Sequence, residues 1–423
     1  MSRPGDQPTR QGLSLQPFRG LRPVADGESL ARLLCPPYDV IDARARDILL
    51  ERDPENAVAV VLPEPTPAGY AEAAQRIDRW VSDGRYITEP EPALYVYEMR
   101  DIAGNVTRGL LGAVELRPAA DGVILPHENT MAGPVADRLA LMTATGTDLE
   151  PIYLVYDGGG TASELVRGID SRPPAATATT PDGITHRLWL VTDRVDLDAV
   201  ATDLATRRAM IADGHHRYAT YQERQRQQRE SAGAGPWDRG LALVVDASDY
   251  GPQVHAIHRV VSGLTLTDAV NDLTPVAAVE EFHGSPAEAL DSLPRGGAFA
   301  AVLTDGRRTW LVMDRDARLA AAAGRPGQLP ELTDLDVTVL HRALVEEIWR
   351  RTDDEATVGY AHGVADALQD AQARGGVAVL LRPTPVAAVT AVAAAGGRMP
   401  RKSTLFTPKP ASGLVMRRLA DQG

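Results

Sequence analysis

Hydrophobic and polar positions follow two different periods along this chain. Alternation at every second residue predicts an antiparallel pair of strands at 93–100 and 107–116. Apolar residues spaced three and four apart predict amphipathic helices at 43–51, 70–83 and 135–143. Short apolar runs predict further strands at 151–156, 185–192, 240–247 and 377–381, and weaker elements of unassigned type at 298–303 and 309–313. Together these patterns predict an α+β fold of mixed, mostly antiparallel sheets.

The length of the chain predicts its division into parts. A chain of 423 residues is long enough for two or three structural units, and no segment of 20–50 residues repeats. We expect a flexible N-terminal tail at 1–16 and an N-terminal α+β region at 17–120. A core with the main chemical motif is expected at 121–260, and a C-terminal α+β region at 261–423.

Charge and composition exclude several classes of protein. The chain has 57 acidic and 44 basic side chains and a net charge of -13, whereas binders of duplex nucleic acid usually carry a basic face. Cys35 is the single cysteine, so no internal disulfide can form. The sequence has no apolar run of membrane-spanning length and no apolar signal segment at its start. We therefore expect a cytoplasmic protein without membrane or nucleic-acid partners, and its oligomeric state stays open.

Lysine is rare and confined to one segment. The 44 basic residues include only two lysines, Lys402 and Lys409. Arginine cannot replace the compact, rotatable ammonium of lysine at a phosphoryl oxygen, so a retained lysine is a candidate functional residue. We expect the C-terminal segment to fold back onto a phosphate site, with chance and codon bias as the alternative explanation.

The motif at 211–218 carries the strongest chemical signal. An apolar run ends in a helix-capping aspartate, a glycine, two histidines and an arginine, namely Asp213, Gly214, His215, His216 and Arg217. Backbone N–H groups at a helix start and a bidentate arginine bind phosphate or carboxylate well. The alternative is an ordinary capped helix whose side chains face solvent.

Three further motifs could contribute to the same chemistry. His127 and Glu128 follow an apolar run, where the glutamate could act as a general base or hold Mg²⁺, or could simply lie in an exposed loop. Tyr38 and Asp39 follow two prolines, although an aspartate there often only caps a turn. His255 and His258, three positions apart, could ligate a metal but lack a matching carboxylate or cysteine pair with zinc spacing, and Arg259 could add to an anion pocket. No Walker loop, G-x-G-x-x-G, G-x-S-x-G or H-E-x-x-H motif is present.

Six motifs, in order along the chain, resemble those of the bacterial and archaeal family called domain of unknown function 1015. They begin at Pro17 (PFRGLRP), Pro36 (PPYDVI), Leu125 (LPHENT), Asp137 (DRL), Ile211 (IADGHHRY) and Met399 (MP-x-KST). The resemblance covers nearly the whole chain, and the family has no assigned activity to carry over.

The core run Asp213–Arg217 is also similar to the motif of the ParB/sulfiredoxin-like fold, which binds nucleotide phosphates at a strand–turn–helix. Kinases that phosphorylate free L-serine carry the same five residues, and so are the most similar in chemistry. ParB proteins show G-x-x-R-x-x-A, from which this chain departs at Thr220. No cysteine lies near the motif, which argues against a sulfiredoxin mechanism.

This second resemblance implies a nucleotide-dependent kinase for free serine or a similar small hydroxy amino acid, or the reverse or hydrolytic reaction on phosphoserine. Glu128 would be the base, Asp39 the reserve base and Lys402 the cation at the transferred group. ATP or ADP with Mg²⁺ would be the cofactor, with the metal ligands left open. The expected phosphate contacts are Asp213, Gly214, His215, His216, Arg217, Ser403, Thr404 and Lys409, and the expected supporting residues are His127, Tyr38, Arg138, His258 and Arg259.

Two other functions stay open at this point. One is a nucleotide-gated regulatory protein similar to ParB, which binds CTP or ATP without acting on a small molecule. The acidic charge and the lack of a clear helix-turn-helix weigh against it. The other is a protein that only binds phosphorylated metabolites.

Overall fold

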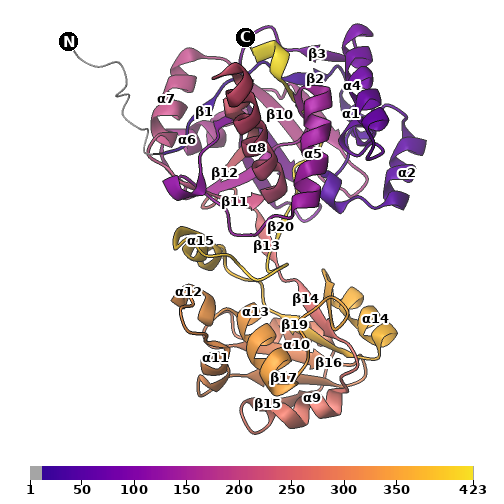
Figure 1. The fold of residues 1–423 in the computed structure, drawn as a ribbon, viewed down its shortest axis with the longest axis vertical. Coiled ribbons are helices and arrows are strands. Elements are labelled where there is room, and N and C mark those ends of the chain that lie inside the picture. Colours follow the sequence, from indigo (N-terminus) through magenta and orange to yellow (C-terminus); the bar gives the residue numbers. More distant parts are fainter. Residues whose placement is uncertain (1–11, 423) are drawn as a thin grey trace, which may run out of the picture. The chain divides into compact units, whose positions relative to one another are not determined.

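The computed structural model describes residues 12–422, which form two compact units. Unit 1 contains the chain up to Pro252 and the segment Pro408–Gly423, and unit 2 is Gln253–Thr407 (Figure 1). The chain passes from unit 1 into unit 2 at 252–253 and returns to unit 1 at 407–408. The three regions expected from the sequence stay a prediction of domain organisation.

Unit 1 is built on a nine-stranded sheet. The strand order is β6-β11-β8-β12-β5-β4-β10-β9, and β1 pairs with β5 off this path. Only β11 with β6 and β12 with β8 run parallel, and the other pairs are antiparallel. The strands are β1 (Leu15–Gln16), β4 (Leu94–Arg100), β5 (Val106–Glu115), β6 (Ile124–Leu125), β8 (Ile152–Tyr156), β9 (Ala176–Thr179), β10 (Thr185–Val191), β11 (Ala209–Asp213) and β12 (Arg239–Asp246).

Helices and two short strand pairs complete unit 1. The helices are α1 (Gly27–Leu33), α2 (Ala43–Arg52), α3 (Val58–Val61), α4 (Pro67–Ser82), α5 (Ala132–Thr145), α6 (Gly160–Gly168), α7 (Arg194–Leu204) and α8 (His215–Ala232). The pairs are β2 (Leu21–Pro23) with β3 (Tyr86–Thr88), and β7 (Thr147–Asp148) with β21 (Arg417–Arg418). Helices α4, α5 and α8 lie side by side (Figure 1).

Unit 2 contains a six-stranded antiparallel sheet with the order β15-β17-β16-β19-β14-β18. Its strands are β14 (His258–Val261), β15 (Ala278–Phe282), β16 (Ala300–Thr304), β17 (Thr309–Met313), β18 (Val358–Ala361) and β19 (Val377–Leu381), and a separate pair joins β13 (Gln253–His255) to β20 (Leu405–Thr407). Its helices are α9 (Leu266–Leu273), α10 (Pro286–Ser292), α11 (Arg318–Ala323), α12 (Pro330–Thr333), α13 (Asp336–Val339), α14 (Val364–Arg374) and α15 (Val386–Ala394), with a π-helix at Leu340–Ile348.

The predicted α+β class with mostly antiparallel sheets is confirmed, and most differences lie at the ends of elements. Helix α4 begins at Pro67, three residues before its expected start, because Thr66 accepts a hydrogen bond from the Gly69 N–H and proline fits the first helical position. Order at the N-terminus begins before residue 17: Leu13 and Leu15 are buried, and β1 pairs with β5. Residues 1–11 of the expected tail lie outside the described chain.

The apolar residues of each unit form their own core. In unit 1, residues such as Leu154, Ile211 and Val244 are fully buried between the sheet and its helices. In unit 2, Val260, Val302 and Leu380 pack against Ala289 of α10 and Ala367 of α14. Within residues 12–422, no helix is both long and apolar enough to cross a membrane.

Candidate functional site

The site in unit 1 is built around the predicted strand–turn–helix. Strand β11 ends at Asp213, Gly214 turns the chain, and α8 starts at His215. Gly214 has a φ of 91°, a left-handed conformation that residues with a Cβ rarely adopt. A Cβ at this position would also lie 3.1 Å from Nε of Arg217. Glycine therefore lets the chain pass directly from the strand into the helix.

Asp213 is the centre of an ion cluster that joins three distant segments. Its Oδ1 lies 2.5 Å from Nζ of Lys409, and its Oδ2 accepts a hydrogen bond from Arg217, one helical turn further along α8. The same Nζ lies 3.6 Å from Oδ1 of Asp39. The C-terminal segment of unit 1 and the loop after Pro37 therefore meet at the start of α8.

Two of the three nitrogens of Arg217, Nη1 and Nη2, are engaged inside this cluster. It is 1% exposed and donates to the backbone oxygen of Pro151 as well as to Asp213. In this arrangement its guanidinium holds Asp213 in place. The bidentate phosphate contact expected for Arg217 stays a prediction, and such a contact would require the guanidinium to leave these partners.

The charges of the cluster are mutually stabilised. Burial raises the pKa of Asp213, but Arg217 and Lys409 outweigh burial and hold that pKa below its usual 3.8. Burial lowers the pKa of Lys409, yet Asp213 and Asp39 raise it above its usual 10.5. Both groups are therefore charged across the physiological range of pH.

Two histidines attach the loop that carries Glu128 to the start of α8. The N–H of His127 donates to Nε2 of His215 at 3.2 Å, and the N–H of Met131 donates to Nε2 of His216 at 3.1 Å. Because Nε2 accepts in both cases, each neutral ring carries its proton on Nδ1. The parallel pairing of β6 with β11 brings this loop to the same edge of the sheet as Asp213.

Glu128 lies between two imidazoles at the surface of the site. Its Oε2 is 3.6 Å from Nδ1 of His215, and its Oε1 is 3.8 Å from Nε2 of His127. The His127 and His215 rings meet edge to face with centroids 4.5 Å apart. The Glu128 side chain is 36% exposed while both histidines are buried, so this carboxylate is accessible to a ligand.

Buried contacts fix the loop that carries Tyr38 and Asp39. The guanidinium of Arg138 stacks on the Tyr38 ring at 4.3 Å and donates to Asp137 and to the backbone oxygen of Val61. Arg138 therefore has a supporting position. Glu150, which the sequence analysis missed, accepts from the Tyr38 N–H at 2.9 Å and from Ser412 Oγ at 2.7 Å.

Glu150 thus joins three segments. In the sequence, the one sign of this role is its position just before a buried strand. Burial raises the pKa of this carboxyl above 4.5, against the opposing charge of Arg217 and the hydrogen bonds it accepts.

The other expected site residues belong to unit 2. Lys402 is exposed, Thr404 is half-buried, and buried Ser403 donates to the backbone oxygen of Pro400 at 2.5 Å. His258 accepts from the Leu381 N–H within the sheet, and burial lowers its pKa to about 4. Arg259 is buried beside the turn at Lys402. A role for these five residues together with Asp213 stays a prediction.

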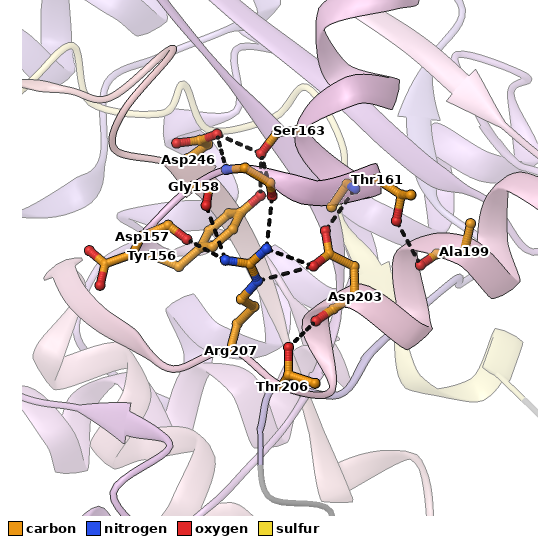
Figure 2. Close-up of polar contacts among 12 residues, drawn as sticks. Tyr156, Asp157, Gly158, Thr161, Ser163, Ala199, Asp203, Thr206, Arg207 and Asp246 are labelled. Atoms are coloured by element: carbon orange, nitrogen blue, oxygen red, sulfur yellow. Dashed lines mark hydrogen bonds and ion pairs between the residues drawn. The ribbon is translucent and has the colours of Figure 1, made fainter.

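A second polar cluster lies at the opposite edge of the unit 1 sheet, because β8 runs antiparallel to β11 (Figure 2). Arg207 donates to the backbone oxygens of Asp157, Gly158 and Gly159 and to Asp203. Asp246 accepts from the Gly159 N–H and from Ser163. The loop 157–160 has three consecutive glycines and so resembles a phosphate loop in composition, but Arg207 and Asp246 fill its polar contacts, so we assign it a structural role.

The residues present fit a loosely held magnesium ion better than a closed metal site. Within residues 12–422, no three histidine, cysteine or acidic side chains are grouped as metal ligands. Mg²⁺ bound with a nucleotide typically takes one or two carboxylates besides phosphates and water. Asp39 fits such a role, because its side chain is 36% exposed and its Oδ1 lies 3.6 Å from Nζ of Lys409, which is too far for a hydrogen bond.

Comparison with known proteins gives the family but no activity. A free serine kinase variant in complex with AMP is 17% identical, with a TM-score of 0.32 over 67% of this chain and 83% of that one. SbnI with a C-terminal truncation, from Staphylococcus aureus, is 12% identical, with a TM-score of 0.35 over 71% of this chain and 85% of that one. A conserved hypothetical protein from Pyrococcus furiosus is 17% identical, with a TM-score of 0.31 over 71% and 94%.

At such scores, the activity of this chain has to be argued from its own residues. No curated protein matches the sequence. The family described as "Protein of unknown function (DUF1015)" matches residues 15–338, and the chain belongs to this family.

Proposed function

We propose that this protein is a nucleotide-dependent phosphotransferase that phosphorylates free serine or a similar small hydroxy amino acid. The same site would serve the reverse or hydrolytic reaction on phosphoserine. One observation carries the proposal: Lys409, Asp213 and Asp39 meet at the first turn of α8, beside the exposed carboxylate of Glu128. The motif resemblance to free serine kinases supports the choice of acceptor.

The nucleotide phosphates would lie against the start of α8. The first turn of a helix has N–H groups without partners inside the helix, and the helix dipole favours negative charge there. Gly214 allows a close backbone approach, and Lys409 supplies a cation 18% exposed at the same place. Arg217 would act through Asp213, which it orients and keeps ionised.

Glu128 would be the general base. As the substrate hydroxyl oxygen attacks the γ-phosphorus, its proton passes to the Glu128 carboxylate. The bond from that phosphorus to the β–γ bridging oxygen breaks, and ADP leaves with the electron pair. His215 and His127 flank this carboxylate and fix its direction. Asp39 is the reserve candidate for the base.

Magnesium would accompany the nucleotide and neutralise charge on its phosphates. Asp39 would take part in holding it, since its carboxylate is the more exposed of the two beside Lys409. Asp213 has both oxygens engaged, by Arg217 and Lys409, and would contribute by fixing the position of Lys409.

Nucleotide binding is tested first, by the shift in melting temperature with ATP, ADP and CTP, each with and without Mg²⁺. The proposal expects stabilisation by ATP and ADP. Lys409→Met should weaken it, and Glu91→Gln, at an exposed position away from the motifs, is the control. If no nucleotide stabilises the wild type, the proposal is wrong.

Transfer is tested with γ-labelled ATP and a panel of free amino acids. Glu128→Gln should keep nucleotide binding and lower turnover by about 10²–10⁴-fold, the usual contribution of a general base. Glu91→Gln, at an exposed position away from the motifs, serves as the control. Nucleotide binding without a phosphorylated product would favour the nucleotide-gated regulatory protein instead.

A further inference from the structure

A turn in unit 2 holds Lys402 in an unusual backbone conformation. Lys402 has a φ of 51°, in the left-handed region that residues with a Cβ seldom adopt. Ser403 closes the turn by donating from Oγ to the Pro400 backbone oxygen at 2.5 Å. Such conformations persist only where surrounding contacts impose them. The side chains that contact this turn therefore fix the backbone position of Lys402.

Arg259 of β14 supplies those contacts. Its Nη2 donates to the backbone oxygens of Lys402 at 2.9 Å and Arg401 at 3.2 Å, and its Nη1 donates to that of Ile257. The side chain is fully buried, and its guanidinium stacks on the Tyr360 ring at 4.7 Å. Among the ion pairs of residues 12–422, none joins Arg259 to a carboxylate. Burial lowers its pKa to about 10.

His341 contacts the third nitrogen of Arg259, Nε. Its Nε2 accepts from Nε of Arg259 at 2.9 Å, and its Nδ1 lies 2.9 Å from Oδ1 of Asp353. An arginine N–H can only donate, so Nε2 carries no proton, and the single ring proton on Nδ1 donates to Asp353. His341 lies on the π-helix Leu340–Ile348, a rare element found mostly at functional sites.

We propose that Arg259 is a positioning residue for the Lys402 turn and that neutral His341, oriented by Asp353, locks Arg259 in place. Without an acceptor at Nε2 of His341, the buried Nε–H of Arg259 would lose this partner and the guanidinium would no longer be locked. The charged groups facing His341 are Arg259 and Asp353, and beyond them lie Arg401, paired with Glu355, and Tyr360. The inference rests on the proposed function through the role predicted for Lys402 at the transferred phosphoryl group.

The two-lysine composition allows a direct test on the full chain. Protein labelled with ¹⁵N only in lysine gives two backbone amide signals, and Lys402→Arg identifies that of Lys402. His341→Leu removes the acceptor of Nε of Arg259, so the Lys402 signal should move while the Lys409 signal stays. In His341→Gln, whose amide oxygen can still accept from Nε of Arg259, the Lys402 signal should stay at its wild-type position.

Arg259→Lys should move the Lys402 signal, because a lysine ammonium cannot reach all three backbone oxygens and His341. The Lys409 signal reports whether unit 1 remains folded in each variant. The inference is overturned if His341→Leu or Arg259→Lys leaves the Lys402 signal unchanged, or if His341→Gln moves it as far as His341→Leu does.

Turnover separates this inference from the proposed function. If the protein is the kinase, His341→Leu and Arg259→Lys should lower kcat without changing KM for the nucleotide, whereas His341→Gln should keep the wild-type kcat. If the lysine signals behave as expected but no phosphoryl transfer is found with any acceptor, the positioning device stands and the proposed function fails.

Discussion

Nζ of Lys409 lies 2.5 Å from Oδ1 of Asp213, although the two residues are 196 positions apart in the chain. This ion pair attaches the C-terminal segment to the turn that begins α8. Asp213 is 11% and Lys409 18% exposed at their side chains, so the pair is largely withdrawn from water. The stability of this attachment and the chemistry of the site therefore depend on the same two charges.

Lys409→Met should lower the free energy of unfolding by about 1–3 kcal/mol, because the largely buried Asp213 loses one of its two cationic partners. Urea denaturation measures the change. Lys402→Met is the control and should stay within about 0.5 kcal/mol, since Lys402 is exposed and has no ion pair with any carboxylate of residues 12–422. Equal losses in the two variants would contradict the assignment of Lys409.

Asp213→Asn should be less stable than the wild type by an amount that depends on pH. The folded chain holds the pKa of Asp213 below its usual 3.8, so the stabilisation is fully present above that value. The difference from wild type should shrink as the pH falls through the lower folded value. Unfolding curves between neutral and strongly acidic pH check this, and a difference that grows on acidification would refute it.

Glu150→Gln should show the opposite dependence. Burial raises the pKa of Glu150 above its usual 4.5, so the stabilisation from the protonated form is present below 4.5 and lost as the pH rises through the higher folded value. Relative to wild type, the glutamine variant should gain stability as the pH rises, since its amide oxygen still accepts from Tyr38 and Ser412. A constant difference at all pH values would show that folding does not raise the pKa of Glu150.

Replacing either histidine should loosen one specific backbone amide. His215→Ala removes the acceptor of the His127 N–H, and His216→Ala removes that of the Met131 N–H. Each amide should exchange its hydrogen about fivefold to tenfold faster, which corresponds to one lost hydrogen bond of about 1 kcal/mol. Hydrogen exchange with peptide-level resolution measures this, and each variant is the control for the other. Acceleration at neither amide would show that these contacts do not hold the loop.

Gly158→Ala should destabilise unit 1, because a Cβ there would lie 1.6 Å from Oδ1 of Asp246 (Figure 2). Displacing this carboxylate breaks its contacts with Ser163 and Gly159, at a cost of about 1–3 kcal/mol. Gly168→Ala is the control: nothing lies within 4 Å of a Cβ there, and alanine favours a helix by about 1 kcal/mol. Thermal unfolding distinguishes the two, and a neutral Gly158→Ala would exclude the packing seen around Asp246.

The sequence predicted local features well where neighbouring residues decide them. The strand–turn–helix at Asp213 could be read from an apolar run, a glycine and a polar helix start. Glu150 could not be found in this way, because its partners Tyr38 and Ser412 lie 112 and 262 positions away. The sequence indicated that Arg217 could bind an anion through two N–H donors. In the folded chain, its guanidinium donates to Asp213 and to the backbone oxygen of Pro151.

The sequence by itself determined the family, the α+β class and the motif residues that we propose as phosphate ligands, because periodicity and motifs are local properties. Tertiary structure alone decided which of these residues meet. Parallel pairing of β6 with β11 brings Glu128 to His215 at the start of α8, and the return of the chain after Thr407 brings Lys409 to Asp213. The two lysines, similar in the sequence, thus have different surroundings: Lys409 is ion-paired in unit 1, and Lys402 is exposed on a turn of unit 2. The physical reason is that burial and charge pairing arise between segments far apart in the chain, which no local pattern records.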